Sequence, residues 1–85
     1  MADEQVTYYA ITGGGSTVDN PRGIVRRRRP AGGGIIDEAL ERDLEWHRTG
    51  IIAEWQRGKF ADELEEVGEE KAMQIIEAFR AGGPY

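Results

Sequence analysis

The chain has 85 residues, a formal net charge of −5 and no cysteine. This length suits a single domain with a modest core, and the lack of cysteine excludes disulfides, iron–sulfur clusters and thiolate zinc sites. The negative net charge opposes nonspecific binding to nucleic acid or anionic membranes, although a local basic strip overrides a net value. We expect one small domain over residues 1–85, with flexible tails at 1–5 and 82–85.

The first third of the chain predicts two strands. Residues 6–12 are rich in β-branched and aromatic side chains and stop at three glycines, which predicts a first strand. Glycine, proline, Asp and Asn make residues 13–23 typical of a loop or wide hairpin turn. Residues 23–29 then predict a second strand that ends at Pro30. Consecutive strands of this kind are usually antiparallel neighbours.

Residues 36–48 fit two different patterns. Ile36, Leu40 and Leu44 recur at helical spacing, which favours a helical turn or short helix at 36–42. Alternating side chains at 43–48 suit a short strand instead. We expect a turn at 36–42 that passes into an extended segment, and both helix and strand stay open here.

Two helices are predicted after residue 48. Thr49 can cap a short helix that ends at Gly58 and turns Ile51, Ile52 and Trp55 inward. Residues 69–80 predict the clearest helix, because four apolar side chains recur at i, i+3, i+4 and i+7. Those four are Ala72, Ile75, Ile76 and Phe79. Between the helices, residues 60–67 fit either a helical period or a short strand at 63–67.

A series of short motifs extends over about residues 7–80. In order they are Tyr8-Tyr9-Ala10, Gly23-Ile24-Val25-Arg26-Arg27, Asp37-Glu38-Ala39, Asp43-Leu44, Trp46 and a Glu-rich helix ending Ile75-Ile76. This order resembles a group of short uncharacterised actinobacterial proteins. The resemblance implies a strand at 63–67 entering a capped helix, and it implies no activity. Gly68 departs from that pattern, since Ser or Thr would cap better.

These patterns together predict an α+β fold. We expect a small antiparallel sheet of three to four strands, covered on one face by two C-terminal helices. The first residues lack the basic and apolar regions of a secretory signal, and no run of about 20 apolar residues is present. We therefore expect a cytoplasmic protein that does not enter membranes. A core of this size suits a monomer or a homodimer.

The most informative feature is the run of four arginines at 26–29. Residues 1–34 carry a net charge of +2 and residues 35–85 a net charge of −7, so the two halves should attract each other. On a strand the four side chains alternate between the two faces of a sheet. We expect one pair to lie along the helices with its charges paired to Glu, and the other pair to be exposed. The arginines are then either an internal ion-pair seam or a binding strip.

The chain offers three weaker candidates for chemistry. Residues 13–17 could face a phosphate, but no helix or lysine follows them, so a hairpin loop is favoured. Asp43 and His47 have the spacing of a hydrogen-bonded helix pair, yet no nucleophile stands near them in sequence. The acidic residues at 62–70 lack the pattern of a calcium loop and suit a solvated face or partners for the arginines.

We therefore expect no enzyme, no cofactor and no metal site. The predicted function is a nonenzymatic protein-interaction module that binds an acidic protein through a strip of aromatic and basic residues. These residues are Tyr9, Arg26, Arg27, Arg28 and Arg29. The alternative is a weak single-stranded nucleic-acid binder that uses the same strip, with bases stacked on the tyrosines.

Overall fold

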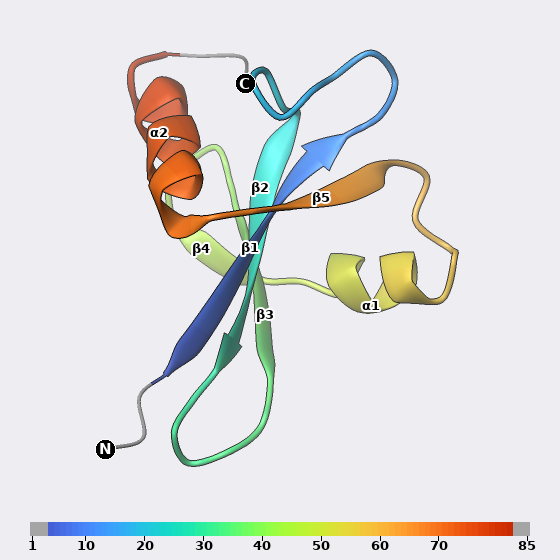
Figure 1. Cartoon of the computed structure of the whole chain (residues 1–85), viewed down its shortest axis with the longest axis vertical. Coiled ribbons are helices and arrows are strands. Elements are labelled where there is room, and N and C mark those ends of the chain that lie inside the picture. Colours follow the sequence, from blue (N-terminus) through green and yellow to red (C-terminus); the bar gives the residue numbers. More distant parts are fainter. Residues whose placement is uncertain (1–3, 83–85) are drawn as a thin grey trace.

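The computed structural model describes residues 4–82, and these form one five-stranded antiparallel sheet with two helices (Figure 1). In chain order the elements are β1 (Gln5–Thr12), β2 (Gly23–Arg29), β3 (Ile36–Leu40), β4 (Trp46–Arg48), α1 (Ile51–Gln56), β5 (Glu63–Val67) and α2 (Glu69–Arg80). The strand order is β4-β3-β2-β1-β5, so β1 and β2 lie near the centre and β4 and β5 form the edges. Of the predicted flexible tails, Gln5 begins β1, whereas residues 1–3 and 83–85 lie outside the described range.

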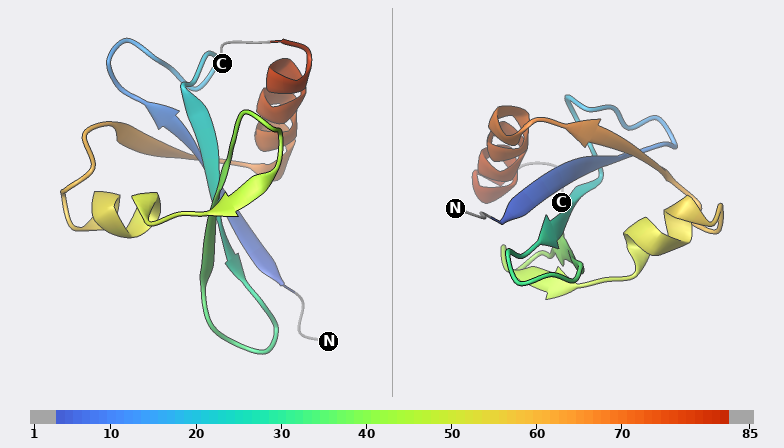
Figure 2. Two further views of the ribbon diagram at one scale, coloured as in Figure 1. Left: turned by 180° about the vertical axis from the view of Figure 1, so that it is seen from behind. Right: turned by 60° about the horizontal axis from the view of Figure 1, so that its bottom comes forward.

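The sheet is covered on both faces, each by a different helix. Tyr8 and Ala10 of β1 pack against α2, and the intervening Tyr9 and Ile11 pack in the cluster formed with α1. Successive side chains of a strand point to opposite faces, so β1 contributes to both clusters. Figures 1 and 2 show α1 and α2 on opposite sides of the twisted sheet.

Each helix contributes apolar side chains to one cluster. The α2-side cluster contains Tyr8, Ala10, Ile24, Leu40, Ala72, Ile75, Ile76 and Phe79. The α1-side cluster contains Val25, Ala39, Ile52 and Leu64 as its buried members. Burial of all four predicted inward positions of α2 confirms the helix inferred at 69–80. Neither helix among residues 4–82 has a long enough apolar stretch to cross a membrane.

The predicted arrangement of the sheet and helices was wrong in three respects. The sheet has five strands rather than three to four, and only α2 is C-terminal, because α1 lies between β4 and β5. The helices also cover opposite faces rather than one. The physical reason is that alternation places apolar side chains on both faces of β1, so both faces need a cover.

Residues 36–40 form a strand, and the predicted helical turn at 36–42 was wrong. β3 pairs with β2 in a register that places Glu38 opposite Arg26 and Asp37 opposite Arg27. Opposite charges directly across a strand pair stabilise the pairing, and this outweighs a helical spacing of only three leucine and isoleucine positions. The strand alternative at 43–48 was right for 46–48, and the strand at 63–67 is confirmed.

The turn between β3 and β4 is held by a partly buried leucine. Leu44 has a φ of 62°, the only positive φ outside glycine among the described residues. A left-handed backbone at a residue with a Cβ costs about 1–2 kcal/mol. The Leu44 side chain packs against the α2-side cluster, and this burial offsets the cost. The turn consequently has one defined shape, which positions Asp43 and His47.

One end of the sheet extends past both helices. We call residues 5–6 and 28–36 the three-stranded arm, since they comprise the ends of β1, β2 and β3 and the connection between the last two. In Figure 1 this arm points downward, away from α1 and α2. Two of its apolar side chains are exposed, Val6 at 37% and Ile35 at 52%. The arm is thus a part of the sheet that neither of the two described helices covers.

Candidate functional site

The four consecutive arginines are divided between the two faces of β2. Arg26 pairs across the sheet with Tyr8, and Tyr8 packs on the α2 side. Arg26 and Arg28 therefore share the α2 side, and Arg27 and Arg29 share the α1 side with Tyr9. The five residues predicted as one contact strip consequently lie on two opposite surfaces.

Arg27 is an internal cross-link between β2, β3 and α1. Its Nε donates to Asp37 Oδ1 at 2.8 Å and its Nη2 donates to Asp37 Oδ2 at 3.0 Å. Its Nη1 reaches Gln56 Oε1 of α1 at 3.5 Å. The residue is 8% exposed, and the two-pronged contact with Asp37 raises its guanidinium pKa further. Arg27 thus stabilises the fold and has little surface to offer a partner.

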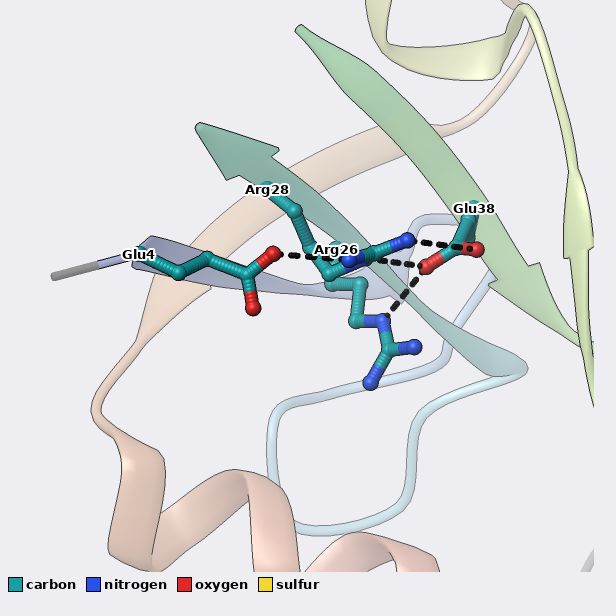
Figure 3. A network of polar contacts seen from close by, with 4 residues as sticks. All are labelled: Glu4, Arg26, Arg28 and Glu38. Carbon is teal, nitrogen blue, oxygen red and sulfur yellow. Dashed lines mark hydrogen bonds and ion pairs between the residues drawn. The ribbon is translucent and has the colours of Figure 1, made fainter. Parts of the chain in front are cut away.

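A second set of contacts on the α2 side joins β2 to β3 and to Glu4, which precedes β1, and we call it the Glu38 network (Figure 3). Glu38 Oε1 accepts from Arg26 Nε at 2.8 Å and from Arg28 Nε at 2.9 Å. Arg28 Nη2 contacts Glu38 Oε2 at 3.4 Å, and Arg28 Nη1 donates to Glu4 Oε2 at 2.7 Å. One carboxylate thereby bridges two neighbouring cations of the same face, and Glu4 supplies the second negative charge.

The Glu38 network favours the ionised forms of Glu38 and Arg28. The hydrogen bonds from Arg28 and then Arg26 lower the pKa of the Glu38 carboxyl below its usual value of 4.5, against the opposing effect of burial. Those from Glu38 and Glu4 raise the pKa of Arg28. Because the Glu38 side chain is only 12% exposed, solvent screens these contacts less than it would screen a surface pair.

Arg26 differs from Arg28 in how much of its guanidinium is used. Only its Nε donates to Glu38, and its Cζ lies 4.0 Å from the centre of the Trp46 ring. Among the described residues, no acceptor engages Nη1 or Nη2 of Arg26, and Figure 3 shows both pointing away from Glu38. Arg28, in contrast, uses all three of its nitrogens. Arg26 therefore presents a fixed and unused pair of donors.

Two further arginines near this region have no acidic partner within residues 4–82. Arg29 is exposed at the end of β2 on the α1 side. Arg48 is exposed in β4 and lies directly across from Glu38, so it shares the α2 side with Arg26. In this part of the α2 side, Arg26, Arg28 and Arg48 exceed Glu38 and Glu4 by one charge, despite the net charge of −5 for the chain.

The acidic partners of the arginines come from an unexpected place. The predicted pairing of two arginines with Glu is confirmed for Arg26 and Arg28, and Glu38 of β3 is their shared partner. The expected exposure of the other pair was wrong for Arg27, which is 8% exposed and is bound by Asp37 of β3. From the acidic residues at 62–70, the described ion pairs include one, between Asp62 and Arg22. The available signal was the placement of two acidic residues just after a short connection from four arginines, which suits a hairpin with opposite charges across it.

The aromatic side chains serve mainly as packing. Tyr9 packs on Trp55 of α1 with ring centres 5.9 Å apart, and Tyr8 is 7% exposed with its ring 6.4 Å from Trp46. Tyr8 therefore offers little surface to a ligand, and the Tyr9 ring is engaged by Trp55. The tryptophans lie on opposite sides of the sheet, Trp46 in the α2-side cluster and Trp55 in the α1-side cluster.

Asp43 and His47 form the predicted contact, although they lie in a hairpin rather than on a helix. His47 Nε2 and Asp43 Oδ2 are 2.8 Å apart, and both side chains are about half exposed. The hydrogen bond from Asp43 raises the pKa of His47 above 6.5, and a backbone N–H from Glu45 helps to lower the pKa of Asp43. The pair faces open solvent at the turn beside Glu41 and Arg42.

We expect Asp43→Asn to lower the pKa of His47 toward the ordinary value of 6.5. A raised folded-state pKa means that the contact stabilises the turn below pH 6.5 and that this contribution is lost as the pH rises through the folded pKa. An NMR titration of the His47 ring in both proteins measures the difference. An unchanged pKa in Asp43→Asn would contradict the contact.

The glycine-rich loop closes on itself and borders a small cavity. Residues 13–16 and 17–20 form two tight turns through backbone hydrogen bonds, such as Ser16 N–H to Gly13 O at 3.0 Å. A cavity of about 210 Å³ separates this loop from α2, where Lys71 Nζ lies 2.6 Å from Asp19 Oδ1. The loop leads into β2 rather than a helix, so the arrangement that places phosphate at a helix N-terminus is not formed.

Comparison with known proteins adds no relative from which a role could be inferred. No family model matches the chain, and no curated protein or solved structure is similar to it. Within residues 4–82, no three His, Cys, Asp or Glu side chains gather as potential metal ligands. The candidate site therefore rests on the arrangement of the arginines on the α2 side.

Proposed function

We propose that this chain is a small nonenzymatic interaction module of the cytoplasm that binds an acidic segment of a partner protein. Its contact surface lies on the α2 side of the sheet, beyond the part of the sheet that α2 covers. This contact surface consists of Val6, Arg26, Arg28, Ile36 and Arg48. The proposal applies equally to a monomer and to a homodimer.

The observation that carries the proposal is a row of partly exposed side chains that α2 does not cover. Val6, Arg28 and Ile36 are direct cross-strand neighbours on β1, β2 and β3, so they form one row on one face. Val6 is 37% exposed, and the Arg28 side chain is 26% exposed. Arginine next to exposed apolar side chains is the composition enriched at protein interfaces.

The local charge favours an acidic partner. Glu38 and Glu4 balance Arg26 and Arg28, and Arg48 adds an unbalanced cation. An approaching carboxylate gains attraction from Arg48 without breaking an existing ion pair. Tyr9 and Arg27, both named in the sequence-based strip, are left out of the contact surface because their side chains are engaged in the α1-side interior.

Single-stranded nucleic acid finds less support as a ligand. Such binding commonly uses aromatic faces on which bases stack beside basic residues. Tyr8 is buried, Tyr9 packs on Trp55, and Arg26 already covers Trp46. Enzymatic use of Asp43 and His47 also lacks a supporting group, because the surface around them holds Glu41 and Arg42 and no nucleophile.

An NMR titration of isotope-labelled protein tests the proposal. A short oligo-glutamate peptide and a short thymidine oligonucleotide are added separately, at low and at near-physiological salt. We expect the peptide to shift amide signals of β2, the start of β3 and β4. A peptide that moves no signal there overturns the proposal. Tighter binding of the oligonucleotide with a steep salt dependence would favour the nucleic-acid alternative.

Two matched variants separate a specific site from general charge. Arg48→Gln and Arg57→Gln each remove one exposed arginine that has no ion-pair partner within residues 4–82, so they change the net charge equally. Arg57 lies at the end of α1, outside the contact surface. We expect peptide affinity to fall about threefold or more in Arg48→Gln and to stay near wild type in Arg57→Gln. Equal losses would indicate nonspecific attraction.

A further inference from the structure

We infer that Arg26 is a preorganised receptor for a single carboxylate. Its two terminal nitrogens donate hydrogen bonds to the two carboxylate oxygens. The inference rests on the proposed function and identifies the group of the partner that the contact surface recognises. It follows from the contacts that already hold Arg26 in place and from the two terminal nitrogens of its guanidinium, which have no described acceptor.

Two contacts fix the plane of the Arg26 guanidinium before any ligand arrives. Nε donates to Glu38 Oε1 at 2.8 Å, and the guanidinium carbon lies 4.0 Å from the Trp46 ring centre. Glu38 is itself held by Arg28, and Trp46 packs against the α2-side cluster. An arginine whose rotamers are already restricted loses less conformational entropy when it binds.

The unused part of Arg26 has the geometry that a carboxylate needs. Nη1 and Nη2 form a planar fork that donates two parallel hydrogen bonds to the two oxygens of a carboxylate. No acceptor within residues 4–82 takes either donor, and the Arg26 side chain keeps 21% of its surface exposed. In Figure 3 this fork extends from the network on the side away from Glu38.

The surroundings favour a carboxylate of a peptide over a dianion such as phosphate. Arg48 lies in the same cross-strand row, beyond Glu38 as seen from Arg26, so it adds a second cation to this face of the sheet. Glu38 lies between the two arginines and repels a doubly charged ligand more than a singly charged one. The exposed apolar Val6 lies in the neighbouring row and suits the side chain of a peptide.

The first test observes the receptor without a partner peptide. Sodium acetate is titrated into labelled protein at constant ionic strength, with chloride replaced by acetate. We expect saturable shifts at the side-chain N–H groups of Arg26 and at the indole N–H of Trp46. The indole N–H of Trp55, on the opposite face, is an internal control and should not move. Equal shifts of both indoles, or none, overturn the receptor.

The second test uses Arg26→Lys, which keeps the charge and removes the fork. Arg29→Lys is the matched control, because Arg29 is exposed on the opposite face without an ion pair among the described residues. We expect oligo-glutamate affinity to fall about tenfold in Arg26→Lys, the loss of one strong charge-assisted hydrogen bond, and to change little in Arg29→Lys. A thermal melt of both variants shows whether they remain folded.

The outcomes separate this inference from the proposed function. If the peptide binds the contact surface equally well in Arg26→Lys and wild type, the receptor is wrong and the interaction module stands. If acetate moves Arg26 and Trp46 but the peptide does not bind, the receptor stands and the proposed function fails. Should Arg26→Lys unfold, the acetate titration of wild type still decides the question, since it needs no variant.

Discussion

Glu38→Ala is expected to lower the free energy of unfolding by about 2–4 kcal/mol, because it leaves two partly buried guanidinium groups without their shared acceptor. Glu38 is 9% exposed and joins β3 to β2 through Arg26 and Arg28. Urea unfolding followed by circular dichroism measures the loss. Glu4→Ala is the control, since the Glu4 side chain is 39% exposed and its ion pair should contribute no more than about 1 kcal/mol.

Glu38 also gives the free energy of unfolding a pH dependence with a defined sign. Because the folded-state pKa of Glu38 is depressed, its contribution is present above its unfolded value of 4.5 and is lost as the pH falls through the lower folded pKa. Stability of the wild type should therefore fall more steeply on acidification than that of Glu38→Gln. Parallel pH profiles, or a Glu38→Ala variant as stable as Glu4→Ala, would contradict a structural role for the network.

Phe79→Ala is expected to lower the free energy of unfolding by about 3–5 kcal/mol, the usual cost of removing a buried aromatic ring. Phe79 is 4% exposed and anchors the last turn of α2 in the cluster with Ile24 and Leu40. A domain of this size has a total stability of about 5–10 kcal/mol, so the variant should be near the limit of folding at room temperature.

Met73→Ala provides the matched control on the same helix. Met73 is 41% exposed, so its truncation should change the free energy of unfolding by no more than about 0.5 kcal/mol. Thermal and urea unfolding of both variants measure the difference. If the two variants were equally stable, α2 would contribute little to the fold through its buried face, and the cover of that side of the sheet would need another explanation.

Local patterns were enough to predict the elements with strong signals. The β-branched and aromatic run of β1 and the four apolar positions of α2 each bury the side chains that their periodicity indicates. The alternation of Arg26–Arg29 between two faces also followed from strand geometry alone. These features depend only on residues within a few positions of one another.

The strand conformation of β3 depends on its pairing with β2, which the local sequence does not reveal. Asp37 and Glu38 have no strong preference for a strand, and the spacing of their neighbours resembles a helix. Their strand conformation is stabilised by hydrogen bonds to β2 and by the ion pairs with Arg27 and Arg26. Such contacts become available only when the two strands meet, so a window of local sequence does not contain them.

Composition and short-range periodicity were sufficient to predict an α+β fold with a cationic strand and a C-terminal amphipathic helix. Which of the arginines lack an acidic partner depended on how the strands pair. Pairing with β3 neutralises Arg27 and Arg28 internally and leaves the Arg26 fork and Arg48 free of described acceptors. Ion pairing depends on distances between strands, and those distances are set by the register of the sheet rather than by any single segment.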